Sequence, residues 1–171
     1  FSGNVSGKRW AFFPSASIAW RMSKENFMEG TKNWLDDLKL RASIGLIGDD
    51  SGSDAYAFLS TYAFGNKLFL NNSTVNSVYL AYVANPNLTW TKTRSWNVGF
   101  DATMWGGLLG VEFDAFYNYT YDILQSLGSD YPPSMGGYYP AYANLGKTDA
   151  KGIDILLTHH NKFTVAGKPF N

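Results

Sequence analysis

The sequence predicts an all-β fold, an antiparallel up-and-down transmembrane β-barrel segment of about five or six strands. Five segments alternate apolar and polar residues with the period of two that marks a β-strand. Long and short connections alternate along the chain, as in outer-membrane barrels with long extracellular loops and short periplasmic turns. Aromatic residues make up 17% of the chain and charged residues only 16%. This composition suits a membrane wall with aromatic girdles.

The alternating segments are expected to be strands. They are residues 13–22, 38–47, 89–105, 108–124 and 151–159. A sixth strand is expected near 163–166. Residues 23–37 should form a compact turn with a short helix, and Gly106-Gly107 is a signal for a two-residue hairpin. Residues 48–88 and 125–146 are expected to be long extracellular loops, so the first, third and fifth segments should run toward the periplasm.

A soluble antiparallel β-sandwich also alternates apolar and polar positions, and it remains the alternative at this point. Its strands are usually about five or six residues long, whereas 89–105 and 108–124 are much longer. The polar faces also carry small residues such as Ser17, Ser43 and Gly99, where a solvated surface usually carries Lys and Glu. These details favour a barrel wall over a soluble or surface β-sandwich that binds through tyrosine-rich loops.

Several function classes find no support in the composition. Lys plus Arg and Asp plus Glu both number 14, so no net charge steers the chain to nucleic acid. Without cysteine there is no disulfide or thiolate–metal framework. We expect no enzyme activity, catalytic residue, cofactor or metal site. The chain shows neither a signal peptide nor a run of about 18 apolar residues, and we expect an internal fragment or a processed chain.

A two-residue turn at Gly106-Gly107 fixes a register for the strands beside it. The expected pairs are Trp105 with Leu108, Phe100 with Phe113, Trp96 with Tyr117 and Asp101 with Glu112. Two like charges directly opposite are destabilising, so a cation should lie near, and Arg41 is the candidate. A carboxylate pair can also be catalytic or metal-binding, but no third ligand or nucleophile accompanies this one. A structural network in the wall is the better interpretation.

The alternation divides the barrel wall into two faces. The residues expected to face lipid are Ile18, Trp20, Leu40, Ile44, Trp96, Val98, Phe100, Val111, Phe113, Ile153 and Ile155. The charged residues expected to face inward are Arg21, Arg41, Asp101, Glu112, Asp114 and Asp154. Lys92 and Arg94 share the parity of the lipid face beside a long loop. They are candidates to meet lipopolysaccharide phosphates, with ordinary solvated charge as the alternative.

Six motifs in one order resemble the barrel of SusC/RagA-type TonB-dependent transporters. They are FPSASIAWR at 13–21, WLDDLKLRASIG at 34–45, NPNLTWTKT at 85–93, NVGFD at 97–101, DAFYN at 114–118, and NLGK with KGID at 144–147 and 151–154. The family patterns are FPSxSxxWR, WLxxLKLRxSxG, NPxLxWExT, NxGxD, DxYxN and NxGxxxNxGxE. The chain departs from them with Thr91 for Glu, Phe116 for Tyr and Asp154 for Glu.

The resemblance implies a partial barrel domain over residues 1–171, without the family's plug or TonB-contacting segment. Family barrels have about 22 strands around a plugged lumen, so this chain should need the rest of its barrel and the plug. It implies import of glycans, oligosaccharides or peptides across the bacterial outer membrane, driven by TonB. The implied partners are a SusD-like surface lipoprotein, the substrate and outer-membrane lipid.

Tyrosine is frequent in the expected extracellular loops, and its ring can stack on sugars while its hydroxyl hydrogen-bonds. In the family that the chain resembles, such loops contact substrate and the lipoprotein lid. The candidates for these contacts are Tyr56, Tyr62, Tyr79, Tyr82, Tyr131, Tyr138, Tyr139 and Tyr142. The alternative for each tyrosine is packing within the loops themselves.

Overall fold

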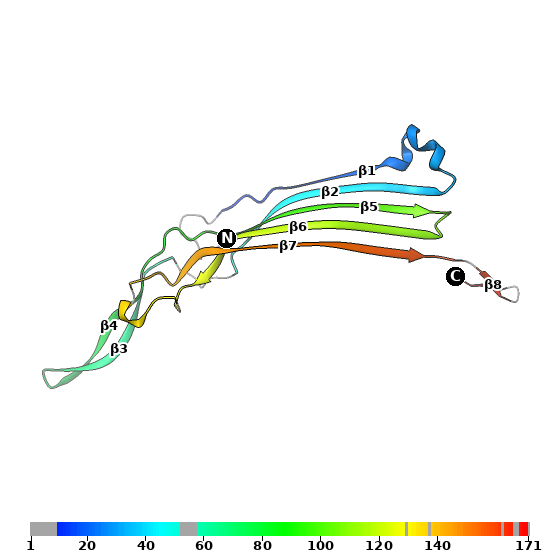
Figure 1. Cartoon of the computed structure of the whole chain (residues 1–171). Coiled ribbons are helices and arrows are strands. Elements are labelled where there is room, and N and C mark those ends of the chain that lie inside the picture. The colour runs from blue at the N-terminus through cyan, green and yellow to red at the C-terminus, as the bar shows by residue number, and fades with distance from the viewer. Residues whose placement is uncertain are drawn as a thin grey trace. The chain divides into compact units, whose positions relative to one another are not determined.

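The computed structural model describes residues 10–51, 58–128, 130–136 and 138–161, and the backbone of 163–165 and 168–170. Its main element is a five-stranded sheet in the order β1-β2-β5-β6-β7 (Figure 1). These strands are β1 (Ser15–Arg21), β2 (Leu35–Asp49), β5 (Thr91–Met104), β6 (Leu109–Ser126) and β7 (Tyr142–His159). Two hairpins complete the strands: β3 (Thr61–Leu70) with β4 (Ser73–Tyr82), and β8 (Phe163–Val165) with β9 (Lys168–Phe170).

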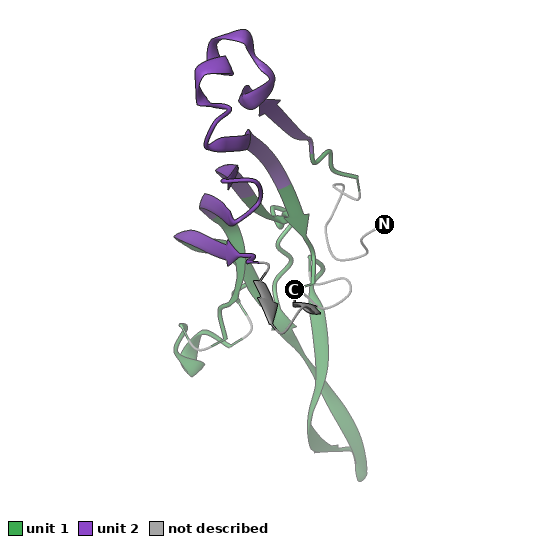
Figure 2. Cartoon of the chain, turned by 90° about the vertical axis from the view of Figure 1, so that its right-hand side faces the viewer, with its two compact units in different colours: residues 1–13, 47–93, 120–148 green, residues 14–46, 94–119, 149–171 purple. Residues whose placement is uncertain are grey.

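The chain divides into two compact units, which Figure 2 distinguishes by colour. The first unit comprises 1–13, 47–93 and 120–148, and the second comprises 14–46, 94–119 and 149–171. The remaining elements are short 3-10 helices: η1 (Met22–Lys24) and η2 (Asn26–Thr31) in the second unit, and η3 (Pro133–Met135) in the first. Within the described residues, no helix has the length and apolarity needed to cross a membrane.

In the second unit, β1 and β2 pair antiparallel in a register that keeps the two faces distinct. Ala16 lies opposite Ile44 and Trp20 opposite Leu40, whereas Ser17 lies opposite Ser43. Because side chains of successive residues in a strand point to opposite faces, apolar residues gather on one side of the pair. We call this side the apolar face and the other the polar face. The alternation predicted for both strands is thereby confirmed.

The turn between β5 and β6 is the predicted two-residue hairpin. Gly106 and Gly107 have φ values of 64° and 85°, and the Leu108 N–H donates to the Trp105 carbonyl at 3.3 Å. Positive φ at both central residues identifies a type I′ turn, which glycine adopts without a steric penalty. The Phe100 and Phe113 rings stack at 5.5 Å, and Trp96 and Tyr117 stack at 5.5 Å. Both contacts confirm the predicted register.

The connection from β1 to β2 is compact, as predicted, but its helices are of the 3-10 type and β2 begins earlier, at Leu35. Asp37 organises this turn because its carboxylate pairs with Arg21 at 3.3 Å and accepts a hydrogen bond from Ser23. The Trp20 indole donates to Glu25 at 3.0 Å. Short-range polar contacts therefore close this end of the β1–β2 pair.

In the first unit, β3 and β4 correct the prediction of one long loop at 48–88. Asn71 and Asn72 have φ values of 48° and 62°, and Asn is among the non-glycine residues that tolerate this conformation best. They form the turn of a hairpin in which Leu70 pairs with Ser73 and Phe64 with Val78. Apolar residues occupy neighbouring positions here, as at Phe69 and Leu70, so a period of two does not stand out.

The ends of β6 and β7 in the first unit are joined through a distorted residue, Asp122, whose φ is 57°. Its carbonyl accepts hydrogen bonds from the Asn144 amide at 2.7 Å and the Thr91 hydroxyl at 3.3 Å. Asn144 also donates to the Thr89 carbonyl and accepts from the Thr89 N–H, both at 2.9 Å. Strand β7 therefore begins at Tyr142, nine residues before the predicted start at Lys151.

A close aromatic–glycine contact joins β6 and β7 in the second unit. A Cβ atom at Gly152 would lie 2.7 Å from the Phe116 ring, so the ring covers the glycine backbone. The contact requires glycine because real Cβ atoms do not approach this closely. A short strand, β8 (Phe163–Val165), lies where the sixth strand was predicted, but it pairs with β9 and is not part of the five-stranded sheet; Ala166, its expected end, lies outside the described residues.

Few apolar side chains are buried. Among the described residues, the buried hydrophobic side chains are Leu35, Leu88, Ala102 and Leu127. A β-sandwich instead buries the alternating inward residues of both sheets in a shared core. The apolar face is exposed, with Ile18 at 70% and Val98 at 61%. The described residues of the chain therefore leave the apolar face of the sheet uncovered.

Candidate functional site

The densest group of charged side chains lies on the polar face of the second unit. Arg41 on β2 places Nη2 2.8 Å from Asp101 Oδ1 on β5 and 2.7 Å from Asp114 Oδ2 on β6. Lys39, two residues before Arg41, places Nζ 3.6 Å from Asp101 Oδ2. These four residues form the ion-pair cluster. It links three neighbouring strands, because β5 lies between β2 and β6 in the sheet.

Gly99 makes the reach of Asp114 across β5 possible. A Cβ atom at this position would lie 2.3 Å from Asp114 Oδ1 and 2.5 Å from the Phe113 carbonyl oxygen. Gly99 is buried beneath the carboxylate. The glycine of the NVGFD segment therefore leaves the space through which a carboxylate on β6 hydrogen-bonds to a guanidinium on β2.

The formal charges of the ion-pair cluster balance, with two cations and two carboxylates. Its side chains are about one-quarter to one-third exposed: 35% for Arg41, 31% for Asp101 and 26% for Asp114. A pair with this exposure is screened less than a surface pair. Both acids already have a protein cation within ion-pair distance, so the arrangement suits a structural network better than a metal centre or a general acid–base pair.

The sequence named Arg41 as the cation near Asp101, and the two side chains are in contact. Glu112, the acid expected to share that cation, is exposed, and Asp114 takes the place beside Arg41 instead. The reason is geometric, since the space above Gly99 lets Asp114 lean across β5. Arg21 pairs with Asp37 at the turn, and Asp154 is exposed on β7. Lys39 is the member that was missed, although it shares the strand parity of Arg41.

On the apolar face, most of the residues expected to meet lipid are exposed. Those above about one-third exposure are Ile18, Trp20, Leu40, Ile44, Trp96, Val98, Ile153 and Ile155. Phe100, Val111 and Phe113 are half-buried. The rings of Phe100 and Phe113 cover each other, which accounts for part of their burial.

The tyrosines expected in loops have several environments in the first unit. Tyr62, Tyr79 and Tyr82 lie on strands β3 and β4, and Tyr142 is the first residue of β7. They therefore correct the loop assignment, while Tyr56 lies outside the described residues. Exposed rings available for contact are those of Tyr62 at 70%, Tyr79 at 54% and Tyr138 at 76%.

Three tyrosines pack on one another in the same unit. Tyr131 stacks on Tyr139 with ring centroids 4.8 Å apart, and Tyr82 meets Tyr139 edge-on at 5.8 Å. The Val83 N–H also donates to the Tyr139 carbonyl at 3.0 Å. These three tyrosines therefore pack on one another, which was the alternative to a contact with substrate or lipoprotein. They fasten the base of the β3–β4 hairpin to the segment before β7.

Comparison with known proteins identifies relatives that match nearly the whole chain. A family model described as TonB dependent receptor-like, beta-barrel, matches residues 1–168. The TonB-dependent receptor SusC of Bacteroides thetaiotaomicron is 29% identical over 163 residues, covering 94% of this chain and 15% of the relative. The TonB-dependent receptor P3 of Formosa agariphila is 32% identical over 167 residues, covering 94% of this chain and 16% of the relative.

Solved structures give the same result for the fold. The RagAB peptide importer in its closed-closed state matches with a TM-score of 0.73 at 22% identity, over 95% of this chain and 17% of that one. Its open-open state matches with a TM-score of 0.73 at 26% identity, over 91% of this chain and 16% of that one. The chain therefore spans about one-sixth of the length of the relatives it matches.

Proposed function

The chain belongs to the TonB dependent receptor-like β-barrel family, and from this premise we propose that it forms a sector of the wall of a bacterial outer-membrane importer. Residues 1–171 would be part of one barrel domain that crosses the membrane several times. A spanning sheet in lipid cannot leave strand edges unpaired, so edge strands β1 and β7 would pair with further strands of the barrel. The sector would act without covalent chemistry.

The observation that carries this proposal is the separation of the two faces. The apolar face exposes Ile18, Ile44 and Val98, while the polar face of the same sheet holds the ion-pair cluster. In a barrel wall, residues alternate between lipid and lumen along each strand. Lipid would cover the apolar face, and the ion-pair cluster would face the interior, against the plug.

A test of this orientation uses two neighbouring residues on β5. These 171 residues contain no cysteine, so within them a nitroxide label goes only to the introduced Val98→Cys or Asn97→Cys. The label is placed in the full-length protein after any cysteine elsewhere in it is replaced, and the protein is reconstituted in lipid vesicles. We expect the label at 98 to collide with oxygen, which dissolves in the bilayer, and the label at 97 to collide with a water-soluble nickel complex. Ile44→Cys and Ser43→Cys provide a second matched pair. Equal accessibility at both members of each pair would contradict a lipid-facing wall.

For the transported substrate, we propose glycans, oligosaccharides or peptides. The relatives support this choice only by name: SusC is a TonB-dependent receptor, and RagAB is a peptide importer. The plug and the segment that receives energy from TonB would belong to the rest of the importer. Uptake by cells that produce the full-length protein, with labelled oligosaccharides and peptides supplied separately, distinguishes the two substrate classes. Uptake that persists when TonB is deleted would contradict the proposed energy source.

For the partner, we propose a SusD-like surface lipoprotein that contacts the β3–β4 hairpin. The hairpin exposes large apolar side chains, among them Phe64 at 79% and Val78 at 59%, which lie opposite each other. Exposed apolar clusters mark protein interaction sites. Tyr62, Tyr79 and Tyr138 would add contacts to lipoprotein or substrate through their rings and hydroxyls.

The hairpin proposal predicts a selective loss of the partner. Replacing Phe64 and Val78 by Thr keeps strand-forming residues but removes the apolar contact. We expect the affinity of the full-length protein for the lipoprotein, followed by co-purification, to fall by roughly thirtyfold, since one buried aromatic anchor is worth about 2 kcal/mol. Lys67→Gln, on the same hairpin, is the control. Unchanged co-purification of the double variant would refute this contact.

A further inference from the structure

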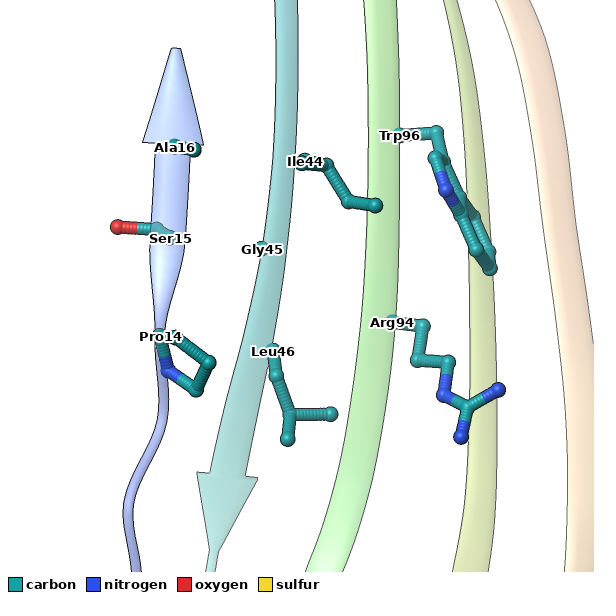
Figure 3. A pocket seen from close by; sticks show the side chains of 8 residues that line it. All are labelled: Pro14, Ser15, Ala16, Ile44, Gly45, Leu46, Arg94 and Trp96. Atoms are coloured by element: carbon teal, nitrogen blue, oxygen red, sulfur yellow. The ribbon is translucent and has the colours of Figure 1, made fainter.

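Two parts of the described chain leave large apolar side chains uncovered, and they differ in kind. In the second unit, a depression of about 280 Å³ on the apolar face is lined by residues that include Ala16, Ile44 and Trp96 (Figure 3). It opens on the side of the sheet that lipid would cover in a barrel wall. In the first unit, the β3–β4 hairpin pairs with no other described strand and exposes apolar side chains on both of its faces. Lipid on one face of a wall does not explain such a hairpin.

The two faces of the hairpin follow from its register. Leu68 lies opposite Val75, and Phe64 lies opposite Val78. Because residues an odd number of positions apart in a strand point to opposite faces, these two pairs lie on opposite sides of the ribbon. All four side chains are exposed. A two-stranded hairpin is only marginally stable in water, whereas three or more strands support one another, so a further element should lie beside this hairpin.

The two outer edges of the hairpin differ in their protection against further pairing. Strand β3 carries Lys67 and an irregular register, in which three positions separate Phe64 from Lys67 while two separate Val78 from Asn76 on β4. The extra residue therefore belongs to β3. Charged side chains and bulges are devices by which proteins block a strand edge. From Ser73 to Leu80, β4 has regular pairing and neither charged residues nor proline, so its edge is the one left open to another strand.

The sequence of β4 also indicates what covers this edge. Its residues STVNSVYLAY are rich in β-branched and aromatic side chains and carry no charge, which is the type of segment that pairs readily with further strands and aggregates when it is left exposed. A partner that binds and dissociates would leave the edge open in its absence. A segment of the same protein covers it at all times. The chain spans about one-sixth of the length of its relatives, so such a segment has room outside these 171 residues.

The register identifies a backbone amide on each edge of the hairpin. The two-residue turn at 71–72 joins Leu70 to Ser73, which lie opposite each other. In such a hairpin the pair beside the turn exchanges hydrogen bonds across the ribbon, and later pairs alternate between bonded and non-bonded. Asn76 lies opposite Lys67, three pairs further along, in a non-bonded pair. The N–H of Asn76 therefore points away from β3, and the N–H of Lys67 points away from β4.

We propose that the outer edge of β4 pairs with an extended segment of the same protein, supplied by an extracellular connection outside these 171 residues. The hairpin then belongs to a sheet of three or more strands, and backbone hydrogen bonds hold the added strand in place. The inference rests on the proposed function, because it requires the remainder of one barrel protein. It leaves the proposed lipoprotein contact intact, since Phe64 and Val78 lie on a face of the hairpin and not on its edge.

The test measures amide hydrogen exchange, residue by residue, in the full-length protein purified in detergent micelles without the lipoprotein. After correction for intrinsic rates, we expect the Asn76 N–H to exchange at least about tenfold more slowly than the Lys67 N–H, because a paired amide must open before it exchanges. Equal corrected rates would overturn the strand addition. Slow exchange at Asn76 that appears only after the lipoprotein is added, or that is lost on dilution as copies separate, would overturn the choice of occupant.

Proline variants locate the added segment. Asn76→Pro removes the outward N–H and keeps the pairing with β3, since proline is accepted on a strand edge where its nitrogen faces outward. We expect one segment outside these 171 residues to exchange at least about tenfold faster in this variant. Lys67→Pro, on the opposite edge, is the matched control and should leave that segment unchanged. No response outside these residues to Asn76→Pro would overturn the proposal. The comparison of amides in the unmodified protein decides the question where a variant fails to fold.

Failure of this inference and failure of the proposed function give different results. Extraction of the full-length protein from membranes by alkaline carbonate would contradict the membrane wall itself. A protein that stays embedded, but whose Asn76 and Lys67 amides exchange at equal corrected rates, would leave the wall intact and remove only the strand added to β4.

Discussion

Asp114 Oδ2 on β6 lies 2.7 Å from Arg41 Nη2 on β2, although β5 separates these two strands in the sheet. The contact passes above Gly99, where no side chain blocks it. The Asp114 side chain reaches over β5 and joins β6 directly to β2, while the contact of Arg41 with Asp101 joins β2 to β5. The contact between Asp114 and Arg41 therefore depends on Gly99, the glycine of β5 over which it passes.

Substitution of Gly99 should be costly for this reason. Gly99→Ala would place a Cβ atom 2.3 Å from Asp114 Oδ1 and 2.5 Å from the Phe113 carbonyl. We expect the free energy of unfolding of the full-length protein to fall by about 1–3 kcal/mol, the usual cost of overpacking. Urea titration in detergent micelles measures it. Gly110→Ala is the control, since the nearest atom to its added Cβ, Thr158 Cβ, would be 3.4 Å away. If both variants lost the same free energy of unfolding, a steric clash at Gly99 would not be the cause.

The energetic coupling within the ion-pair cluster should exceed that of the exposed pair at the β1–β2 turn. In a double-mutant cycle of Arg41→Gln and Asp114→Asn, we expect a coupling of about 1 kcal/mol or more, because the bond is charge-assisted and partly buried. The matched cycle uses Arg21→Gln and Asp37→Asn, whose wild-type side chains are 53% and 39% exposed. It should give less than about 0.5 kcal/mol. A larger coupling energy for Arg21 and Asp37 than for Arg41 and Asp114 would show that burial does not determine the strength of these ion pairs.

The hairpin between β5 and β6 should discriminate among residues at position 106. Gly106 has a φ of 64°, which costs a non-glycine residue roughly 1–2 kcal/mol and a β-branched one more. Gly106→Val should therefore lower the free energy of unfolding, whereas Gly106→Asn should be nearly neutral, because Asn accepts this backbone conformation. Gly30→Ala, where nothing lies within 4 Å of the added Cβ, controls for loss of glycine itself. Similar losses for Val and Asn would argue against a type I′ turn.

Asn144 should hold the backbone of the first unit together. Asn144→Ala removes hydrogen bonds to the Thr89 N–H, the Thr89 carbonyl and the Asp122 carbonyl. A backbone N–H left without its partner costs about 1–3 kcal/mol, so the Thr89 amide should exchange at least about tenfold faster with deuterium. Exchange followed by mass spectrometry measures this. Asn76→Ala, at an exposed position on β4, should leave the rate at Thr89 unchanged, and a comparable acceleration there would refute the local effect.

The sequence was most informative where local chemistry decides the structure. The strands beside Gly106 could be placed, together with their register, because a two-residue turn fixes every pair that follows it. The contacts between Trp96 and Tyr117 and between Phe100 and Phe113 follow from that one turn. The two faces of β1 and β2 could likewise be assigned, since apolar residues recur at every second position from Ala16 to Trp20 and from Leu38 to Leu46.

The rest depended on relationships that alternation does not encode. The hairpin at Asn71 and Asn72 was missed because apolar residues are exposed on both of its faces, which removes the period of two. The early start of β7 was missed because residues such as Lys147 and Asp149 are exposed in succession with other polar ones. The choice of Asp114 over Glu112 depends on the open space above Gly99, which alternation does not reveal.

The contact between Phe116 and Gly152 has an evolutionary consequence. The Phe116 ring occupies the space that a Cβ atom at Gly152 would need, so neither position can drift freely while the other stays constant. Among homologous chains, positions 116 and 152 should covary: an enlarged residue at 152 should accompany a reduced one at 116. A change in size at one position, compensated by the opposite change at the other, would keep the volume between β6 and β7 filled. Selection would then act on positions 116 and 152 together.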